Sequence, residues 1–303
     1  MKPRTCRAVG SNIGTQKLFA QKLAALTKRF NDMVASDIVH MLIDEGFLTK
    51  PEEKDVGEAQ DASFWQIFRK LKAAGFFPSG SIGKRIDEFT AERSARWLIK
   101  AQEDAKDVSH WFARALARDV TSSQRRSLEA AGLSTNWMKD KWTVPIIGKQ
   151  YVSPSAAKAI EEAAKSNVEL ITKIATNDLA RLQSVITENL ASGGTVADLR
   201  KSLQNFDGFD EKRAARVALD QSNKYAAEIQ RRNAKAIGIT KGIWIHVPGK
   251  FTSRETHIAM NGKEFDLDKG LYDSAVGQWV VPGQLPYCRC QFRQVLPTEV
   301  LHK

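Results

Sequence analysis

The chain has 303 residues, of which 42% are hydrophobic and 27% are charged. This composition is typical of a folded protein and excludes a wholly disordered, collagen-like or silk-like chain. The length predicts either two domains or a helical body with an appended unit. No apolar run approaches the roughly 18 residues that a membrane-spanning helix needs. The best candidate, residues 34–48, is interrupted by Asp37, His40, Asp44 and Glu45, so the sequence excludes a membrane-spanning protein.

The chain is basic, with 46 Lys and Arg residues against 35 Asp and Glu residues and a net charge of +11. The charge is uneven, because residues 1–30 contain seven basic side chains and no acidic one. A positive surface favours a polyanionic neighbour, since each neutralised phosphate releases condensed counterions. The sequence therefore admits nucleic acid as a partner without identifying it.

The cysteine content is low, with only Cys6, Cys288 and Cys290. A secreted disulfide scaffold would need more cysteines, and Cys288 and Cys290 are too close in sequence for an unstrained bridge. No apolar segment with a cleavage site follows Met1. The sequence favours a cytosolic protein with reduced thiols.

Helical periodicity dominates the first two thirds of the chain, with apolar residues at three- and four-residue steps. Thr15 is the predicted N-cap of the first helix, and Ser153–Pro154 is a typical helix start. A weak domain boundary is predicted at residues 137–151, where the periodicity breaks. The predicted elements are a helix over 15–48, an exposed connection over 51–61, a short helix over 64–74, a loop over Ser79–Ser81, helices over 86–118 and 123–131, an irregular segment over 137–151, and helices over 153–191, 195–203 and 210–237.

The pattern changes after Gly238 to short β-branched and aromatic runs separated by Gly and Pro turns. Strands are predicted over 239–247, 265–267, 279–281 and 289–295. We therefore predict a mainly α fold, an extended helical body with a small α+β C-terminal module. The predicted domains are 1–150, a helical region of unassigned role; 151–238, a helical lead-in; and 239–303, the turn-rich α+β module.

His257, Cys288 and Cys290 form the main candidate site, because imidazole and thiolate are the ligands that zinc prefers. The single residue between the cysteines departs from the usual ligand spacing, and a fourth ligand would have to be a carboxylate such as Asp266 or Asp268. The alternative is that both thiols are small buried hydrophobes and His257 is a hydrogen-bonded structural histidine.

Two further readings of the sequence concern catalysis and nucleic acid. A Cys–His nucleophilic pair would need a thiolate of lowered pKa and an orienting third group, and no HExxH, GxSxG, P-loop or GxGxxG motif occurs, so catalysis is not expected. A basic helical face could contact phosphates, although a solvated face with a charge-matched C-terminus is the commoner explanation. The candidate nucleic-acid residues are Lys224, Arg231, Arg232 and Lys235.

The chain carries an ordered set of short motifs: Ala218–Lys224, Gly238–Thr240, Trp244, Arg254, His257, Gly262–Lys263, Pro282–Gln284 and Cys288–Cys290. Their combination resembles the phage Mu F-like minor head proteins, the head morphogenesis proteins of tailed bacteriophages. The resemblance covers roughly residues 153–297, whereas residues 1–150 carry no assignable motif. One departure is that Pro248–Gly249–Lys250 stands where many members have an acidic residue before the Arg.

The resemblance implies a non-enzymatic minor capsid protein that acts in procapsid assembly at or near the portal. Its implied partners are the portal protein, other head proteins and, in some members, packaged double-stranded DNA. The implied location is the capsid interior or the portal vertex, with assembly in the host cytoplasm. The resemblance also implies that His257, Cys288 and Cys290 are metal ligands, with zinc as the candidate cofactor. Structural roles are expected for Trp244, Arg254, Gly262, Pro282, Gly283 and Arg289. The alternatives are a DNA-binding protein that holds or delivers the genome and a metal-dependent hydrolase.

Overall fold

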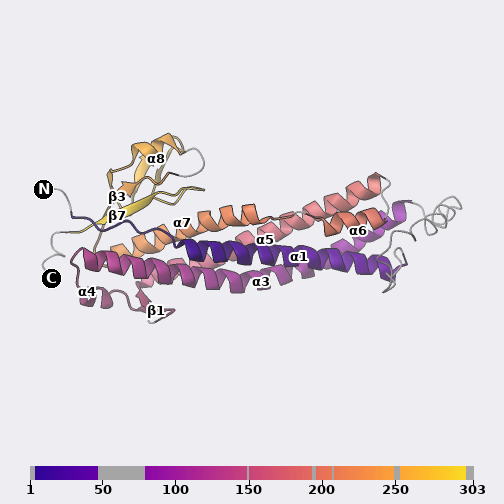
Figure 1. The fold of residues 1–303 in the computed structure, drawn as a ribbon, viewed down its shortest axis with the longest axis horizontal. Helices are drawn as coiled ribbons and strands as arrows, with labels where there is room; N and C mark the ends of the chain where they lie inside the picture. Colours follow the sequence, from indigo (N-terminus) through magenta and orange to yellow (C-terminus); the bar gives the residue numbers. More distant parts are fainter. Residues whose placement is uncertain are drawn as a thin grey trace. The chain divides into compact units, whose positions relative to one another are not determined.

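A computed structural model of the protein describes residues 4–46, 79–148, 150–192, 196–206, 208–248 and 253–297. Four long helices make up most of it: α1 (Ile13–Asp44), α3 (Ser79–Ala130), α5 (Pro154–Ala191) and α7 (Glu211–Ala236). Most of the short strands lie in the C-terminal part of the chain (Figure 1). The expected fold class, mainly α with a small α+β C-terminal module, is confirmed.

The chain divides into two compact units that interleave along the sequence. One unit comprises Met1–Ala24, Asp104–Leu170 and Asp210–Lys303, and the other comprises Ala25–Glu103 and Ile171–Phe209. Helices α1, α3 and α5 each contribute residues to both units. The predicted domains 1–150, 151–238 and 239–303 are continuous in sequence, whereas these units are not. The predicted domain division stays a prediction.

The unit formed by 25–103 and 171–209 has a helical core. Apolar side chains from α1, α3, α5 and α6 (Val196–Gln204) pack together there, and Trp97 is fully buried among them. The indole Nε1 of Trp97 donates a hydrogen bond to Asp37 Oδ2 at 2.7 Å. The buried carboxylate of Asp178 accepts hydrogen bonds from Asn31 Nδ2 at 3.0 Å and from the backbone N–H of Phe209 at 2.9 Å. Apolar burial and paired polar groups therefore stabilise this unit together.

The other unit has a helical core of its own, formed by the remaining parts of α1, α3 and α5 with α7. The rings of Phe19 and Phe112 stack there with centroids 3.8 Å apart. Small residues, including Ala163, Ala218 and Ala226, are buried in this core. Small side chains let helices approach closely, so the packing depends on them.

The structure corrects the predicted boundaries of the first helices. Helix α1 begins at Ile13 because Asn12 Oδ1 accepts the backbone N–H groups of Gly14 and Thr15, so Asn12 rather than Thr15 caps it. The predicted loop over Ser79–Ser81 is wrong, since α3 begins at Ser79, and Ser and Gly are common at helix starts as well as in loops. The predicted connection 51–61 and helix 64–74 lie outside the described residues.

The predicted break between residues 118 and 123 is also wrong, because α3 runs without interruption to Ala130. Val120, Thr121 and Gln124 are buried in this stretch, and Gln124 Nε2 donates to the backbone oxygen of Gln230 at 2.9 Å. Tertiary contacts of this kind outweigh the weak helix preference of β-branched and Ser residues.

The irregular segment predicted over 137–151 contains regular structure. Helix α4 (Thr135–Lys139) precedes an antiparallel hairpin of β1 (Val144–Ile146) and β2 (Gln150–Val152). The helix start at Pro154 is confirmed, with Ser153 Oγ accepting the backbone N–H of Ala156 at 3.1 Å.

Helix α7 follows its sequence prediction at both ends. Asp210 Oδ1 caps its first turn by accepting the backbone N–H of Arg213 at 2.6 Å. Gly238 has a φ of +82° just after its last turn, and the backbone N–H of Ile239 bonds to the oxygen of Ala234. This arrangement is the glycine-terminated helix end that the sequence predicts, and it turns the chain into the first strand of the C-terminal module.

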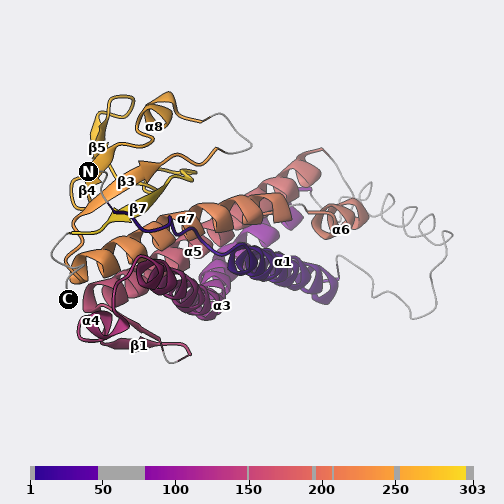
Figure 2. The same ribbon diagram turned by 60° about the vertical axis from the view of Figure 1, so that its left-hand side comes forward.

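The C-terminal module is built on an antiparallel sheet of order β4–β3–β7, formed by β4 (Glu264–Asp266), β3 (Lys241–Ile245) and β7 (Gln291–Val295). The register places Trp244 opposite Phe292 and Gly242 opposite Phe265. A separate hairpin joins β5 (Leu271–Asp273) to β6 (Gln278–Val280), and the short helix α8 (Glu255–Ala259) lies between β3 and β4 in sequence. Figure 2 shows that β3 and β7 lie next to α7. Helix α8 lies on the opposite side of the sheet from α7.

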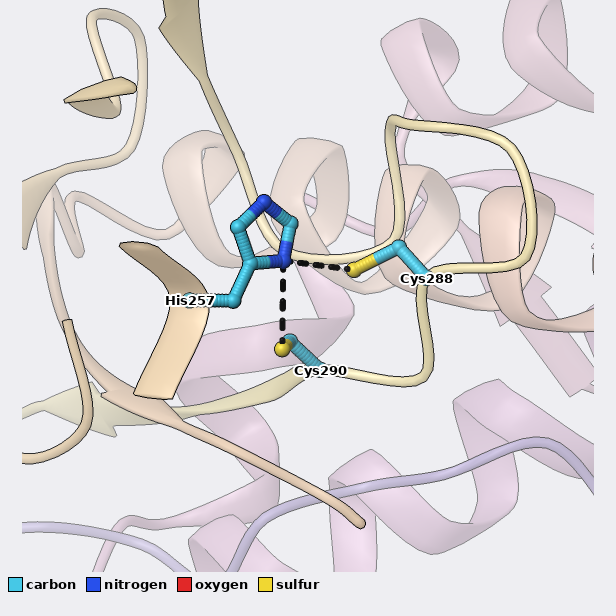
Figure 3. Close-up of side chains that lie close together, drawn as sticks. All are labelled: His257, Cys288 and Cys290. Atoms are coloured by element: carbon cyan, nitrogen blue, oxygen red, sulfur yellow. Dashed lines mark hydrogen bonds between the residues drawn. The ribbon is translucent and has the colours of Figure 1, made fainter. Parts of the chain in front are cut away.

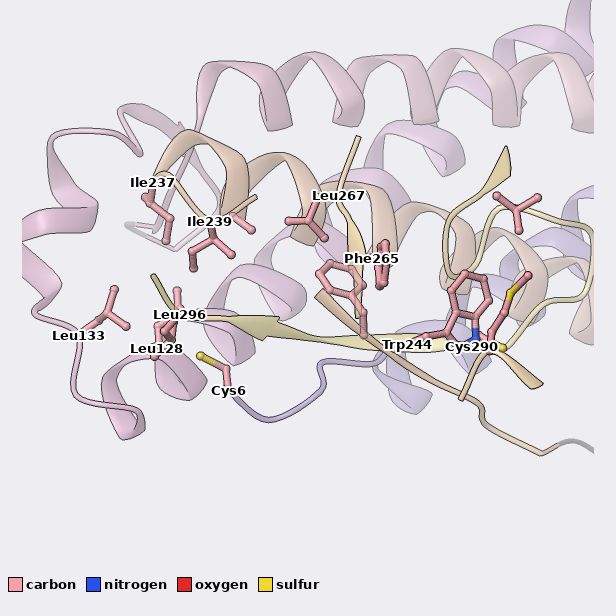
Figure 4. Close-up of a cluster of buried hydrophobic side chains, with 14 of the residues drawn as sticks. Cys6, Leu128, Leu133, Ile237, Ile239, Trp244, Phe265, Leu267, Cys290 and Leu296 are labelled. Atoms are coloured by element: carbon pink, nitrogen blue, oxygen red, sulfur yellow. The ribbon is translucent and has the colours of Figure 1, made fainter. Parts of the chain in front are cut away.

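The N-terminal residues pair with the outer edge of β7. Thr5 forms a bridge with Val295, Cys6 donates its N–H to Gln294 at 3.0 Å, and Leu296 donates to Arg4 at 2.9 Å. Cys6, together with Leu128 and Leu133 of the α3 end, then joins the core beneath the sheet, whose other members include Trp244, Phe265 and Cys290 (Figure 4). The sequence did not predict this pairing.

Candidate metal centre

His257, Cys288 and Cys290 converge in the C-terminal module. His257 lies on α8, and the two cysteines lie in the extended segment that enters β7. The Nδ1 atom of His257 is 3.4 Å from Cys288 Sγ and 3.6 Å from Cys290 Sγ, so it faces both thiols (Figure 3). All three side chains are buried, and their potential ligand atoms lie within 4.8 Å of one another. These residues form a group that can hold a metal ion.

The other ring nitrogen of His257 is held by a buried carboxylate. Nε2 of His257 lies 3.1 Å from Asp273 Oδ2, at the end of β5. Burial raises the pKa of Asp273, but hydrogen bonds from Thr256 and Ala275 and the neighbouring His257 outweigh it and hold the pKa below its ordinary value. An ionised carboxylate accepts the Nε2 proton and fixes the ring so that Nδ1 faces the two thiols.

The thiols differ in their acidity. Hydrogen bonds from Cys290 and His257, against the effect of burial, lower the pKa of the Cys288 thiol to about 4, and the backbone N–H groups of Cys290 and Gly283 contribute. The same Cys288, together with burial, raises the pKa of Cys290 above its ordinary value. This shift favours the thiolate of Cys288, the form in which a cysteine binds a metal.

Trp244, on β3, packs against the imidazole of His257. Its fully buried indole lies edge-on to the His257 ring, with centroids 5.3 Å apart, and also contacts Phe265. The backbone of Trp244 is fixed by the following turn, because its N–H bonds to Lys263 and its oxygen accepts the N–H of Gly262, which has a φ of +79°. The turn at Asn261–Gly262 thus positions the imidazole indirectly.

The turn before Cys288 is held by three contacts. Gly283 has a φ of +81° and lies so close to α7 that an added Cβ would be 3.0 Å from the backbone oxygen of Asn223. The guanidinium of Arg254 donates to the oxygen of Pro286 at 3.0 Å, and the N–H of Tyr287 donates to the Asp220 carboxylate. Arg254 therefore ties the start of α8 to the Cys-bearing turn. Pro282 is buried beside Gly283.

A cavity of about 500 Å³ opens next to the cysteines. Arg289, which the sequence assigned a structural role, lines it together with Arg216, Arg254 and His246. No Asp or Glu is among the described residues that line it. The cavity wall is therefore basic, apart from the thiols themselves.

The donor set fits zinc on two observations. Tetrahedral zinc sites with Zn–S of about 2.3 Å and Zn–N of about 2.0 Å place neighbouring ligand atoms roughly 3.6 Å apart, which matches the 3.4 and 3.6 Å separations of His257 Nδ1 from the thiols. The buried Nε1 of Trp244 has no oxygen or nitrogen partner among the described residues and lies by Cys290 Sγ (Figure 4). A metal-bound thiolate is a strong acceptor for such a donor.

The carboxylates suggested from the sequence as a fourth ligand are engaged elsewhere. Asp266 accepts the backbone N–H groups of Asp268 and Lys269, and Asp268 pairs with Lys235. Asp266 ends β4, and Asp268 lies in the turn that follows. The Asp266 carboxylate closes this turn through its two hydrogen bonds. That suggestion is wrong for this structure.

The candidate nucleic-acid residues lie on α7, but most of their charges are compensated. Arg231 and Arg232 both contact the Glu228 carboxylate, and Arg232 also pairs with Glu162 at 3.0 Å. Burial raises the pKa of Glu228, yet the two arginines outweigh it and hold the pKa below its ordinary value. Lys235 pairs with Asp268, and Lys224 is exposed, with its Nζ 5.6 Å from the Tyr225 ring centroid. DNA contact through this face stays a prediction.

Two residues of the site escaped the sequence analysis. Asp273 was not singled out because a lone Asp in a turn-rich segment is more often a turn residue, and it does accept the N–H of Ala275 at 3.0 Å. His246 follows β3 and lies 3.7 Å through Nδ1 from Cys290 Sγ. Its place two residues after Trp244 was the available signal, because alternate strand residues share a face.

One known family matches part of the chain. Residues 180–293 match the family model of "Phage Mu protein F like protein", so this segment carries a phage Mu F-like domain of the head morphogenesis type. The matched segment contains His257, Cys288 and Cys290, and the resemblance inferred from the motifs is confirmed.

An uncharacterised protein of Haemophilus influenzae (strain Rd) is 26% identical to this chain over 160 residues. The match spans 53% of this chain and 34% of the Haemophilus protein, so the chain covers about a third of that relative. No solved structure matches the chain. Within the described ranges, no helix combines the length and apolar character that a bilayer crossing requires.

Proposed function

We propose that this protein is a non-enzymatic minor head protein of a tailed bacteriophage that acts in procapsid assembly at or near the portal. The observation that carries the proposal is the family match over 180–293, which contains every residue of the His/Cys/Cys group. The proposed partners are the portal protein and other head proteins, and the proposed location is the capsid interior or the portal vertex.

The metal centre has a structural role in this proposal. His257 on α8 and the two cysteines, Cys288 and Cys290, in the segment entering β7 would bind one zinc ion. When bound, zinc supplies a cross-link between these two segments of a small module whose strands have three to five residues. Such a cross-link would add to the apolar packing beneath the sheet, because metal binding to the folded site contributes folding free energy. A rigid module of this kind suits a docking element of an assembling head.

The experiment is a head-assembly assay in the phage or prophage that encodes the chain. The gene is deleted and complemented with wild-type protein, with the Cys288→Ala/Cys290→Ala variant or with Lys139→Gln as a surface control. Particles are separated on a density gradient, and the protein is followed in filled heads, empty heads and free fractions. The proposal expects wild type and control in heads together with portal protein, and few or misassembled heads for the double variant. Normal heads without the protein would contradict it.

The second candidate function is a protein that holds or delivers the genome. The basic cavity wall of Arg216, Arg254 and Arg289 and the net charge of +11 favour it. Binding of a short DNA duplex is measured over a salt series for wild type, Lys224→Gln/Lys235→Gln and Lys212→Gln, a control at the other end of α7. Phosphate contacts through the candidate face predict a steep salt dependence that flattens in the double variant alone. A flat wild-type slope with retained portal association favours the structural function.

A further inference from the structure

His246 stands at the open side of the metal centre. It follows β3, its side chain is half-buried, and it lines the same cavity as His257, Cys288 and Cys290. Its Nδ1 atom lies 3.7 Å from Cys290 Sγ. The backbone is fixed, because the N–H of His246 donates to Asn261 Oδ1 at 2.9 Å. An imidazole is thus held at the edge of a group that lacks one ligand.

The distance from His246 to Cys290 is that of two ligands of one ion. Neighbouring ligand atoms in a tetrahedral zinc site are roughly 3.6 Å apart, and the pairs His257–Cys288, His257–Cys290 and His246–Cys290 are at 3.4, 3.6 and 3.7 Å. His246 lies outside the group whose ligand atoms are all within 4.8 Å of one another. Rotation of its side chain toward Cys288, with the backbone in place, would complete the set.

The charge and composition of the cavity favour this imidazole over other ligands. The described lining residues include no carboxylate, and Asp266 and Asp268 are held in the turn after β4. Two thiolates and two neutral imidazoles leave a bound Zn²⁺ with no net charge, which suits a site whose cysteines and His257 are buried.

The geometry points to His246 as the fourth ligand of a closed Cys₂His₂ zinc site with His257, Cys288 and Cys290. Closure distinguishes the site from a catalytic centre, which keeps one position for water or substrate. The inference rests on the proposed metal centre, and its own content is the identity of the fourth ligand.

The experiment loads the full chain with Co²⁺, whose visible spectrum reports the number and type of ligands, and then displaces it with Zn²⁺ to obtain affinities. The variants are His246→Ala, His257→Ala and, as a matched control, His40→Ala on α1. Loss of a residue that only orients a ligand lowers metal affinity by roughly 10–100-fold. Because His246→Ala removes a ligand, its zinc affinity should be at least about 100-fold lower than that of wild type. Wild type should show the spectrum of a four-coordinate site with two thiolates, unchanged by azide. Imidazole added to His246→Ala should enter the vacated position and restore that spectrum.

The results distinguish a wrong metal centre from a wrong fourth ligand. If wild type and His40→Ala bind no metal, the metal centre itself is wrong. If wild type binds Co²⁺ and His246→Ala binds it with equal affinity and an identical spectrum, the centre stands but His246 is not a ligand. A wild-type spectrum that changes with azide overturns the closed site in the same way, because it reveals an exchangeable position.

Discussion

The carboxylate of Asp273 lies 3.1 Å from Nε2 of His257, and both side chains are almost fully buried. The contact orients the ring so that Nδ1 faces Cys288 and Cys290. A carboxylate behind a ligating histidine fixes the tautomer and raises the basicity of the ligand. The β5 hairpin, which carries none of the candidate ligands, thereby becomes part of the candidate metal centre.

Replacing Asp273 with Asn should weaken zinc binding by about 10–100-fold while the secondary structure is retained. The amide keeps the size of the side chain but no longer holds the Nε2 proton through a charge. Competition against a zinc-binding dye measures the affinity, and far-UV circular dichroism checks the fold. Asp140→Asn, a change at an exposed position after α4, is the control. Equal affinities of the two variants would show that Asp273 has no part in the site.

Gly283→Ala should destabilise the protein more than Gly277→Ala does. Both glycines have a positive φ, so each substitution introduces backbone strain of about 1 kcal/mol. Only at Gly283 would the new Cβ also meet α7, at 3.0 Å from Asn223 O and 3.1 Å from Ala227 Cβ, whereas nothing lies within 4 Å at Gly277. Urea unfolding should give a free energy of unfolding lower by about 1–3 kcal/mol for Gly283→Ala than for Gly277→Ala. Similar values would mean that the approach to α7 is not tight.

Tyr287 has a φ of +59° although it is not a glycine, and its side chain is exposed. Asn tolerates this left-handed conformation and Val does not. Tyr287→Asn should therefore leave the thermal midpoint unchanged or higher, while Tyr287→Val should lower the free energy of unfolding by about 1–2 kcal/mol. Equal stability of the two variants would show that the conformation is not enforced in solution.

The buried Cys6 thiol predicts a loss of stability at high pH. Burial raises its pKa from 9.0 to about 11, with Ser127 and Arg4 opposing the rise. The folded state then holds a proton that the unfolded state releases, so the contribution is complete below about pH 9 and is lost as the pH rises toward 11. The free energy of unfolding should fall by about 2–3 kcal/mol more in wild type than in Cys6→Ala over this interval. Parallel pH profiles from urea unfolding would contradict the assignment to Cys6.

Much of the fold follows from local signals in the sequence. Helix α7 was predicted almost to the residue, and Asp210 and Gly238 supply the capping geometry at its two ends. The long helix α3 was split because Thr121 and Gln124 are stabilised by contacts with distant residues that local pattern does not contain. Strand β5 was missed because its three residues carry no alternation long enough to detect.

The potential ligands of the candidate site could be predicted from the sequence, but the residues that surround and orient them could not. His257, Cys288 and Cys290 were singled out by residue type, and the structure brings them together. Their supports depend on register and turn geometry: Asp273 reaches His257 from another hairpin, and His246 faces Cys290 only because β3 pairs with β7. The suggested ligand Asp266 lies on β4 of the same sheet, but its carboxylate closes a turn.

The pairing of residues 4–6 with residues 294–296 has a consequence for synthesis on the ribosome. Strand β7 must leave the exit tunnel before residues 4–6 can pair with it, so these residues wait without their sheet contacts while the intervening chain is translated. An open strand edge is a template for pairing with other chains. A bulky fusion placed directly before residue 4 would compete with this late step, whereas the same fusion on a flexible spacer would not.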